Sequence, residues 1–246
     1  MTTGLRARPF ILWFSLLMAT NAAANECVVL LHGLLRSENS MNRMEKLLTE
    51  AGWDVRNISY ESTELPLETL ADEAVPRGVT ACPDASSIHF VTHSMGGILL
   101  RQYLENNDID RLGRVVMLGP PNQGSEVIDR YGDFPGFTWF SGPAGMQLGT
   151  GEASIPRSLG SVTFDLGVIA GNKTINPILS RSLPDKDDGK VSVDSTRVEG
   201  MNDHLEMPVT HVFMMRDKEV IGQVDHYLRN GYFLRSDDSR KSDDIP

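Results

Sequence analysis

The stretch HFVTHSMGG, residues 89–97, is an apolar run that stops at a serine followed by two glycines. A short run of this kind is typical of a strand buried on both faces. In an open parallel α/β sheet, reactive side chains gather where the strands end. A sharp turn from strand to helix would push Ser94 out of the sheet, and the small Gly96 would let the following helix pack closely. The stretch therefore favours an exposed serine nucleophile over the alternative, a serine that only caps a helix.

Strand-like and helix-like segments alternate along the rest of the chain. The predicted strands are 27–31, 55–60, 88–92, 114–118, 165–170 and a last short strand at Val209. The predicted helices are 40–51, 65–77, 96–106 and 218–229. This alternation predicts an α/β domain over residues 25–235 with a mostly parallel, doubly wound sheet.

Two further motifs support a nucleophilic role for the serine. VVLLHGL, residues 28–34, ends the first strand at His32-Gly33, and LGPPNQGS, residues 118–125, follows the strand after the serine. With H-G-L, T-H-S-M-G-G and P-N-x-G-S in this order, the chain resembles an α/β-hydrolase of the bacterial lipase/esterase type over nearly all of 27–235. Thr92 stands where the G-x-S-x-G elbow has its first glycine, which predicts a less tight or differently packed turn.

The resemblance implies a catalytic base downstream of the serine, because the chain order in this fold is serine, acid, histidine. His204, His211 and His226 are the histidines in that part of the chain. We favour His211, which follows the last predicted strand and precedes the last helix, where the family carries its base. His204 lies in the polar segment GMNDHLE and is the alternative, whereas His226 lies within the last helix and is expected to be structural.

The acid is expected on the loop that follows the strand at 165–170. Only Asp188 stands in D-G-x-V, which resembles the acid motif of the family. Gly189 would allow a tight turn that aims the preceding carboxylate inward. The alternative is a solvated acidic loop, PDKDDGK, whose charges all face water. The other acids of this loop are Asp185, Asp187 and Asp194.

These residues together predict acyl transfer to water. The resemblance implies that Ser94 attacks an ester carbonyl with His211 as its base, and that the backbone N–H groups of Leu34 and Met95 form the oxyanion hole. The expected function is hydrolysis of carboxylic esters of the acyl or lipid kind. The alternatives are an acyltransferase and a binding protein of this fold without activity.

The segment 131–160 interrupts the alternation with seven glycines and three prolines. Phe134, Phe137, Trp139 and Phe140 lie close together within it. We expect a small lid-like insertion that suits an apolar acyl chain and can contact a lipid interface. The alternative is ordinary core packing around a long loop.

Composition argues against several other classes of protein. The formal net charge of −10 disfavours nucleic acid as a partner. No spacing of histidine and cysteine fits zinc and no G-x-x-x-x-G-K-S loop is present, so no metal or cofactor is expected.

The two ends of the chain differ in composition from the predicted domain. Residues 1–24 combine two arginines, an apolar run of about ten residues and the three consecutive alanines 22–24, which predicts a cleaved signal peptide and an exported, periplasmic or secreted protein. The alternative, a membrane anchor, is disfavoured because the run is too short to span a bilayer. Residues 236–246 are charged and are expected to form a disordered acidic tail.

Cys27 and Cys82 are the cysteines of the chain. Cys27 begins one predicted strand and Cys82 precedes another, and in the fold that the chain resembles these strands are neighbours. The expectation is therefore a disulfide at the edge of the sheet away from the serine, which an oxidising compartment permits. The alternative is two unrelated buried thiols.

Overall fold

The computed structural model describes residues 25–134, 136–174 and 186–235. Six strands in this part of the chain form one sheet in the order β2-β1-β3-β4-β5-β6, and every neighbouring pair is parallel. The strands are β1 (Glu26–Leu31), β2 (Asp54–Ile58), β3 (Ser87–His93), β4 (Leu112–Leu118), β5 (Leu166–Gly171) and β6 (Asp203–Met207).

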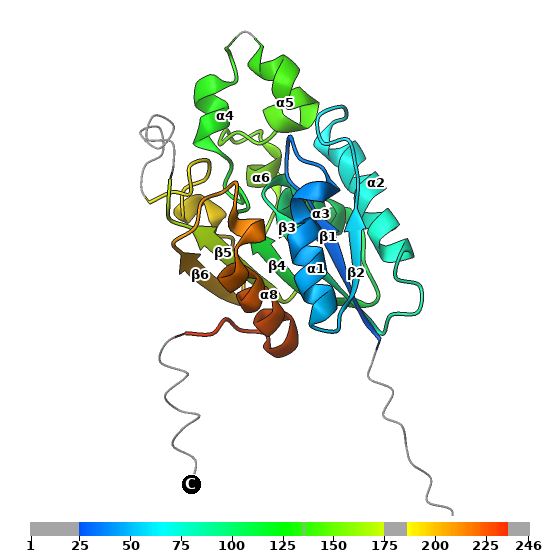
Figure 1. Ribbon diagram of the computed structural model, residues 1–246. Helices are drawn as coiled ribbons and strands as arrows, with labels where there is room; N and C mark the ends of the chain where they lie inside the picture. The colour runs from blue at the N-terminus through cyan, green and yellow to red at the C-terminus, as the bar shows by residue number, and fades with distance from the viewer. Residues whose placement is uncertain (1–24, 135, 175–185, 236–246) are drawn as a thin grey trace, which may run out of the picture.

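Helices cover both faces of the sheet (Figure 1). The α-helices are α1 (Asn42–Glu50), α2 (Leu67–Thr80), α3 (Met95–Asn106), α4 (Glu126–Tyr131), α5 (Phe137–Met146), α6 (Ile155–Ser158) and α8 (Lys218–Asn230). The short 3-10 helices are η1 (Glu38–Met41), η2 (Asp194–Thr196) and η3 (Met214–Arg216). None of the helices described is long and apolar enough to cross a membrane.

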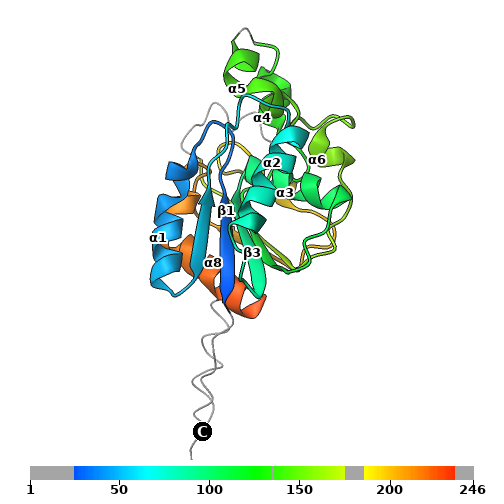
Figure 2. The same cartoon turned by 90° about the vertical axis from the view of Figure 1, so that its right-hand side faces the viewer.

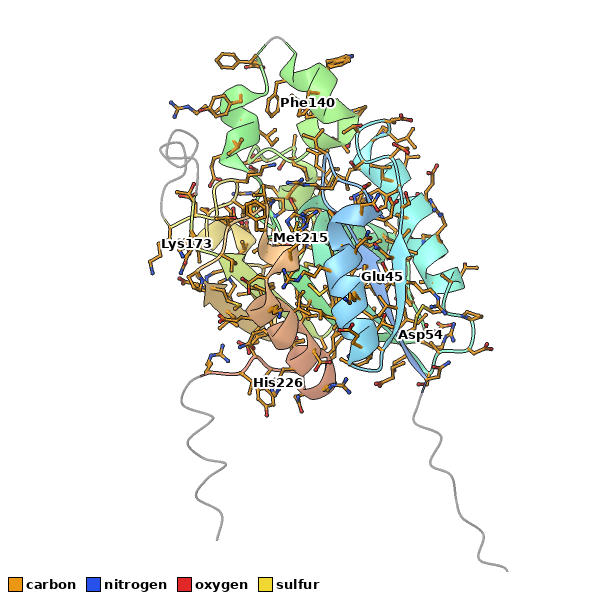
Figure 3. All side chains as sticks on the ribbon, in the orientation of Figure 1. Glu45, Asp54, Phe140, Lys173, Met215 and His226 are labelled. Carbon is orange, nitrogen blue, oxygen red and sulfur yellow. A yellow bond between two sulfur atoms is a disulfide. The ribbon has the colours of Figure 1, made fainter. Side chains whose placement is uncertain are left out.

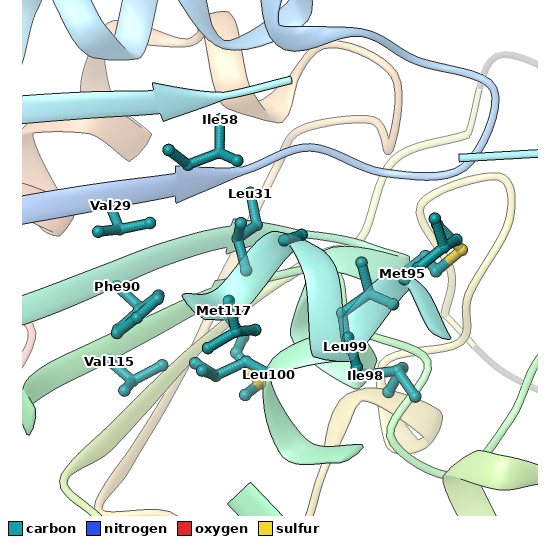
Figure 4. Close-up of a cluster of buried hydrophobic side chains, with 14 of the residues drawn as sticks. Val29, Leu31, Ile58, Phe90, Met95, Ile98, Leu99, Leu100, Val115 and Met117 are labelled. Carbon is teal, nitrogen blue, oxygen red and sulfur yellow. The ribbon is translucent and has the colours of Figure 1, made fainter. Parts of the chain in front are cut away.

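The pleat of the strands divides the core into two layers. Along β1, Val28 and Leu30 pack toward α1 and α8, whereas Val29 and Leu31 pack toward α2 and α3. Figure 2 shows α1 and α2 on opposite sides of the sheet, and Figure 4 shows Val29 and Leu31 beside the side chains of α3. Because successive side chains of a strand point to opposite faces, a continuous apolar run such as CVVLL supplies both layers. The predicted doubly wound parallel sheet is confirmed.

The order of the strands determines where a site can form. The chain moves outward from β1 to β2 and then returns to place β3 on the other side of β1. The loops after β1 and β3 therefore leave the sheet in opposite directions, and a crevice opens between them at the carboxyl ends of the strands. The HGL segment follows β1 and Ser94 follows β3, so both candidate motifs lie at this crevice.

The prediction of a last strand at Val209 is wrong. The strand is β6, which runs from Asp203 to Met207 and includes His204. Its side chains are only half buried because β6 lies at the edge of the sheet, so the segment resembles a polar loop in sequence. Pro208 then ends the ladder because proline has no N–H to donate.

The predicted insertion stands above the carboxyl ends of the strands (Figure 1). It contains α5 and α6 and is preceded by α4, which ends at Tyr131, and α5 is interrupted at Gly142, whose φ is +65°. A Cβ at Gly142 would lie 1.8 Å from the carbonyl oxygen of Thr63, so glycine is needed where α5 meets the loop before α2. Gln147 fastens α5 to α2, since it accepts from the Leu67 N–H at 2.7 Å and donates to Glu68 at 2.8 Å.

Cys27 and Cys82 form a disulfide with their Cα atoms 6.1 Å apart, so the predicted pairing is confirmed. The bond ties the start of β1 to the segment between α2 and β3. The predicted signal peptide and acidic tail, at 1–24 and 236–246, lie outside the described residues.

Candidate active site

Ser94 occupies a strained turn between β3 and α3. Its φ of +54° and ψ of −123° lie in a region of backbone conformation where residues other than glycine are rarely found. Gly96 makes the turn possible, because a Cβ there would lie 2.6 and 2.7 Å from the carbonyl oxygens of Leu31 and His32. Thr92 is buried beneath the turn, and its Oγ1 lies 3.2 Å from the position that a Cβ on Gly97 would take. Thr92, which stands in place of the first glycine of the elbow, therefore fits because Gly97 has no side chain.

Ser94, His211 and Asp188 form a continuous hydrogen-bonded chain. The Ser94 Oγ lies 3.0 Å from His211 Nε2, and His211 Nδ1 lies 2.7 Å from Asp188 Oδ2. The carboxylate accepts hydrogen bonds only, so the proton on the ring belongs on Nδ1 and leaves Nε2 as the acceptor from the serine. His211 and Asp188 are buried, and Ser94 is partly exposed.

A tight turn holds the Asp188 carboxylate. Its Oδ1 accepts from the N–H groups of Lys190 and Val191 at 3.0 and 2.9 Å, and its carbonyl accepts from the N–H of His211 at 2.9 Å. Gly189 has a φ of +98°, as the turn predicted for it requires. One carboxylate oxygen therefore faces the backbone, while the other faces the imidazole.

The competing acids and histidines lie elsewhere. The Asp187 carboxylate accepts from the Gly189 N–H at 2.7 Å, and Asp194 is exposed and paired with Arg197. His204 lies on β6, where its Nε2 is 2.9 Å from Thr196 Oγ1 and burial lowers its pKa to about 4. His226 lies away from this site and bonds to Asn230 on α8. Asp185 lies outside the described residues.

Two backbone N–H groups flank Ser94 where an oxyanion would form. Met95 is the first residue of α3, so its N–H has no acceptor within the helix. The Leu34 N–H makes no hydrogen bond within the described ranges, whereas the N–H of Leu35 is taken by Ser62 Oγ at 3.1 Å. Gly33 brings this loop close, since a Cβ there would lie 3.0 Å from the Cβ of Ser94.

His93 also contacts the site, although nothing in the sequence assigned it a role there. Its Nε2 donates to the backbone carbonyl of His211 at 2.9 Å, and the two rings lie 4.8 Å apart between centroids. Burial, and then repulsion from His211, lowers the pKa of His93 well below its ordinary value. His93 is therefore neutral and supports the loop that carries His211, a contact across 118 residues that no local pattern reveals.

The P-N-x-G-S loop links α3 to the segment that carries Asp188. The side chain of Asn122 accepts from Arg101 at 3.1 Å and donates to the Thr196 carbonyl at 2.8 Å. Ser125 Oγ donates to the Lys190 carbonyl at 3.1 Å. Arg101 is buried, and burial lowers its pKa to about 10. The motif thus supports the segment that carries Asp188, and its first and last residues, Pro121 and Ser125, also line the cavity of the serine.

Above Ser94 and His211 opens a mostly apolar cavity of about 540 Å³. Much of its wall comes from the insertion, and Figure 3 shows Phe140 on α5 above the sheet. The residues of the insertion and its approach that line it are Ser125, Val127, Ile128, Tyr131, Phe134, Phe137, Phe140, Ser141 and Leu148. Three of the four aromatic residues singled out in the sequence, Phe134, Phe137 and Phe140, thus line the cavity. Trp139 points away from the core and is 87% exposed.

Among the residues described, no group of three or more His, Cys, Asp or Glu side chains is placed to hold a metal ion.

At the level of sequence, no family model matches the chain and no curated protein is a significant match. Solved structures do match. The mature form of lipase BlEst2 from Bacillus licheniformis is 19% identical with a TM-score of 0.66, over 84% of this chain and 93% of the lipase. Phospholipase PlaB from Legionella pneumophila is 18% identical with a TM-score of 0.64, over 89% of this chain and 62% of that one. A metagenomic carboxyl esterase is 17% identical with a TM-score of 0.61, over 86% of this chain and 70% of that one. The chain therefore has the α/β-hydrolase fold in the form found in bacterial lipases and esterases.

Proposed function

We propose that the protein is a serine hydrolase that cleaves carboxylic esters. The observation that carries this proposal is the hydrogen-bonded chain from Ser94 through His211 to Asp188, with the serine open to an apolar cavity. A protein that only binds a ligand has no need of a nucleophile, a base and a buried acid in this order. The lipase, phospholipase and esterase names of the matching structures favour the same chemistry.

The reaction follows from the geometry of these side chains. His211 Nε2 takes the proton of Ser94 Oγ as the oxygen attacks the ester carbonyl, and the carbonyl oxygen becomes an oxyanion. The N–H groups of Leu34 and Met95 stabilise that charge, while Asp188 stabilises the imidazolium. His211 then gives the proton to the departing alcohol. Water repeats the sequence on the acyl-enzyme and releases the acid.

The cavity supports an apolar acyl group as the substrate. Aromatic and aliphatic side chains of the insertion form part of its wall, namely Tyr131, Phe134, Phe137, Phe140 and Leu148. Phe134, Trp139 and Phe140 are at least 59% exposed and lie on or beside α5. We infer that this surface contacts a lipid interface. The disulfide supports export to an oxidising compartment.

The test of this proposal is covalent labelling together with the variant Ser94→Ala. The purified protein should gain the mass of one fluorophosphonate group on Ser94 and hydrolyse para-nitrophenyl butyrate, whereas Ser94→Ala should do neither, with turnover lower by about 10⁴-fold or more. Wild-type turnover in Ser94→Ala would contradict the proposal, and absence of both labelling and turnover in the wild type would favour a binding protein. Formation of a new ester when an alcohol is added would indicate an acyltransferase.

A further inference from the structure

The cavity above Ser94 carries a local charge opposite to that of the molecule. The chain has a formal net charge of −10, yet no Asp or Glu is found among the described residues that line the cavity. The formally charged lining residues are Arg36 and Lys190. Two cations in a mostly apolar cavity of an acidic protein create a local positive potential beside the serine.

The two cations come from loops on different sides of the serine, and their backbones are well held. Arg36 follows the HGL segment, where Ser62 Oγ bonds both to the Leu35 N–H at 3.1 Å and to the Arg36 carbonyl at 3.4 Å. Lys190 is held at both backbone ends: its N–H donates to Asp188 and its carbonyl accepts from Ser125. Both side chains therefore start from fixed positions next to the proposed catalytic residues.

No carboxylate neutralises these side chains directly. Within the described ranges, neither the Arg36 guanidinium nor the Lys190 ammonium makes an ion pair or a hydrogen bond. Burial lowers the pKa of Lys190 and repulsion from Arg36 lowers it further, whereas attraction to the buried Asp188 carboxylate raises it. Asp188 is hydrogen-bonded to His211 and to backbone N–H groups and does not line the cavity, so two cations and no anion face the cavity itself. An anion between them would relieve the repulsion and replace lost hydration.

We propose that Arg36 and Lys190 bind an anionic oxygen group of the substrate, so that the enzyme prefers esters that carry a phosphate or carboxylate near the scissile bond. This proposal rests on the proposed ester hydrolysis and names the substrate class for it. Arginine can bind either group through two parallel hydrogen bonds, and lysine adds a point charge. The apolar wall would take the acyl chain while the two cations hold the charged end.

The experiment compares esters that share one acyl chain. The anionic probes are para-butanoyloxybenzoate and para-butanoyloxyphenyl phosphate, and the neutral probe is para-butanoyloxybenzamide. We expect the ratio of kcat/KM for an anionic over the neutral ester to fall roughly tenfold or more in Arg36→Gln/Lys190→Gln relative to the wild type. The intrinsic reactivities of the esters cancel when the ratio in the variant is divided by the ratio in the wild type. The anionic ester whose ratio falls further identifies the preferred group, phosphate or carboxylate.

The controls remove the same charges elsewhere. Arg43 and Lys46 are exposed residues of α1 that do not line the cavity, so Arg43→Gln and Lys46→Gln should keep the wild-type ratio. The single variant Arg36→Glu should shift the preference toward para-butanoyloxyphenyl trimethylammonium, which is a cationic ester. This variant replaces the double variant in the test if the double variant fails to fold. An unchanged ratio in the folded double variant, or in Arg36→Glu, would overturn the proposal.

A binding measurement separates this proposal from the proposed function. In the Ser94→Ala background, octyl phosphate and octanoate should bind more tightly than octanol. Adding Arg36→Glu should weaken the binding of the anions by roughly tenfold or more. Equal affinities with and without Arg36→Glu would overturn the anion site even if esters are hydrolysed. If the wild type hydrolyses no ester, the proposed function fails, while the loss of anion affinity would still support the site.

Discussion

Asp188 presents its two carboxylate oxygens to different partners, and this determines what an amide would do there. Oδ1 accepts from two backbone N–H groups, so the oxygen of an asparagine would remain on that side. Its NH₂ group would then face His211 Nδ1 and force the ring proton onto Nε2. In that tautomer the imidazole cannot take the proton of Ser94.

We therefore expect Asp188→Asn to fold normally and to lose about 10³- to 10⁴-fold in kcat. Turnover of para-nitrophenyl butyrate measures the loss, with thermal unfolding as the test of folding. The matched control is Asp187→Asn, which keeps an oxygen for the Gly189 N–H and should remain within about tenfold of the wild type. If Asp187→Asn is the crippled variant, the acid has been assigned to the wrong neighbour.

His93 offers a second test at the level of one residue. The Nε2–H that it donates to the His211 carbonyl holds the loop of this proposed base, whereas the hydrogen bond of the Ser94 Oγ is to His211 Nε2. His93→Phe should lower kcat about tenfold, because the base is less well positioned, with little change in KM. His93→Gln can place an amide N–H near the same carbonyl and should recover much of the rate. Equal kcat values for both variants would show that the hydrogen bond does not position His211.

The edge strand β6 should make the fold sensitive to acid. The pKa of His204 on this strand is lowered to about 4 from the ordinary histidine value of 6.5, first by burial and then by repulsion from Arg197. The folded protein therefore binds fewer protons at this site than the unfolded chain, and stability decreases as the pH falls from 6.5 toward 4.

We expect the free energy of unfolding, measured in urea at several pH values, to decline across this window. The decline should be shallower in His204→Gln, which keeps a donor for Thr196 but does not titrate. Thr196 Oγ1 donates to the Val193 carbonyl at 2.6 Å, so it is free to accept from residue 204. Identical pH profiles for the two proteins would show that His204 does not contribute to the acid sensitivity.

Elements with strong periodicity were predictable from the sequence, and β6 was not. The buried strands β1 and β3 are apolar throughout because both of their faces are covered. In β6 only Met207 is buried, so the strand carries no such signal. The order of serine, acid and histidine, together with the D-G-x-V motif and the position of His211 before the last helix, selected three side chains that the structure brings together. The contact of His93 with His211 depends on tertiary packing and could not be predicted from local pattern.

At the scale of the whole molecule, the disulfide and the candidate site lie at opposite ends of β1. Cys27 is near the start of the strand and Leu34 follows its end, so at the rise of an extended chain they lie about 20 Å apart. The bond closes a loop with a sequence separation of 55 residues. Stability and activity should therefore respond differently to its removal.

We expect Cys27→Ala/Cys82→Ala to lower the free energy of unfolding by about 4 kcal/mol, because the cross-link restricts the unfolded chain. The kcat for para-nitrophenyl butyrate should be unchanged at a temperature where the variant remains folded. Urea unfolding of the wild type with and without reductant provides the matched comparison. A midpoint that does not move on reduction would contradict the expected stabilisation.

The parallel sheet also determines how the molecule can be attached to a surface. The Ser86 N–H bonds to the Asn25 carbonyl at the start of β1 and β3, and the Phe233 N–H bonds to Asp203 at the start of β6. Asn25 and Arg235 thus lie at the end of the sheet where the strands begin, opposite the cavity, as Figure 1 shows for the start of β1 and the end of α8. A resin or electrode joined to the chain at either point would face away from Ser94. Immobilisation through Asn25 or Arg235 therefore leaves the mouth of the cavity turned toward the solution.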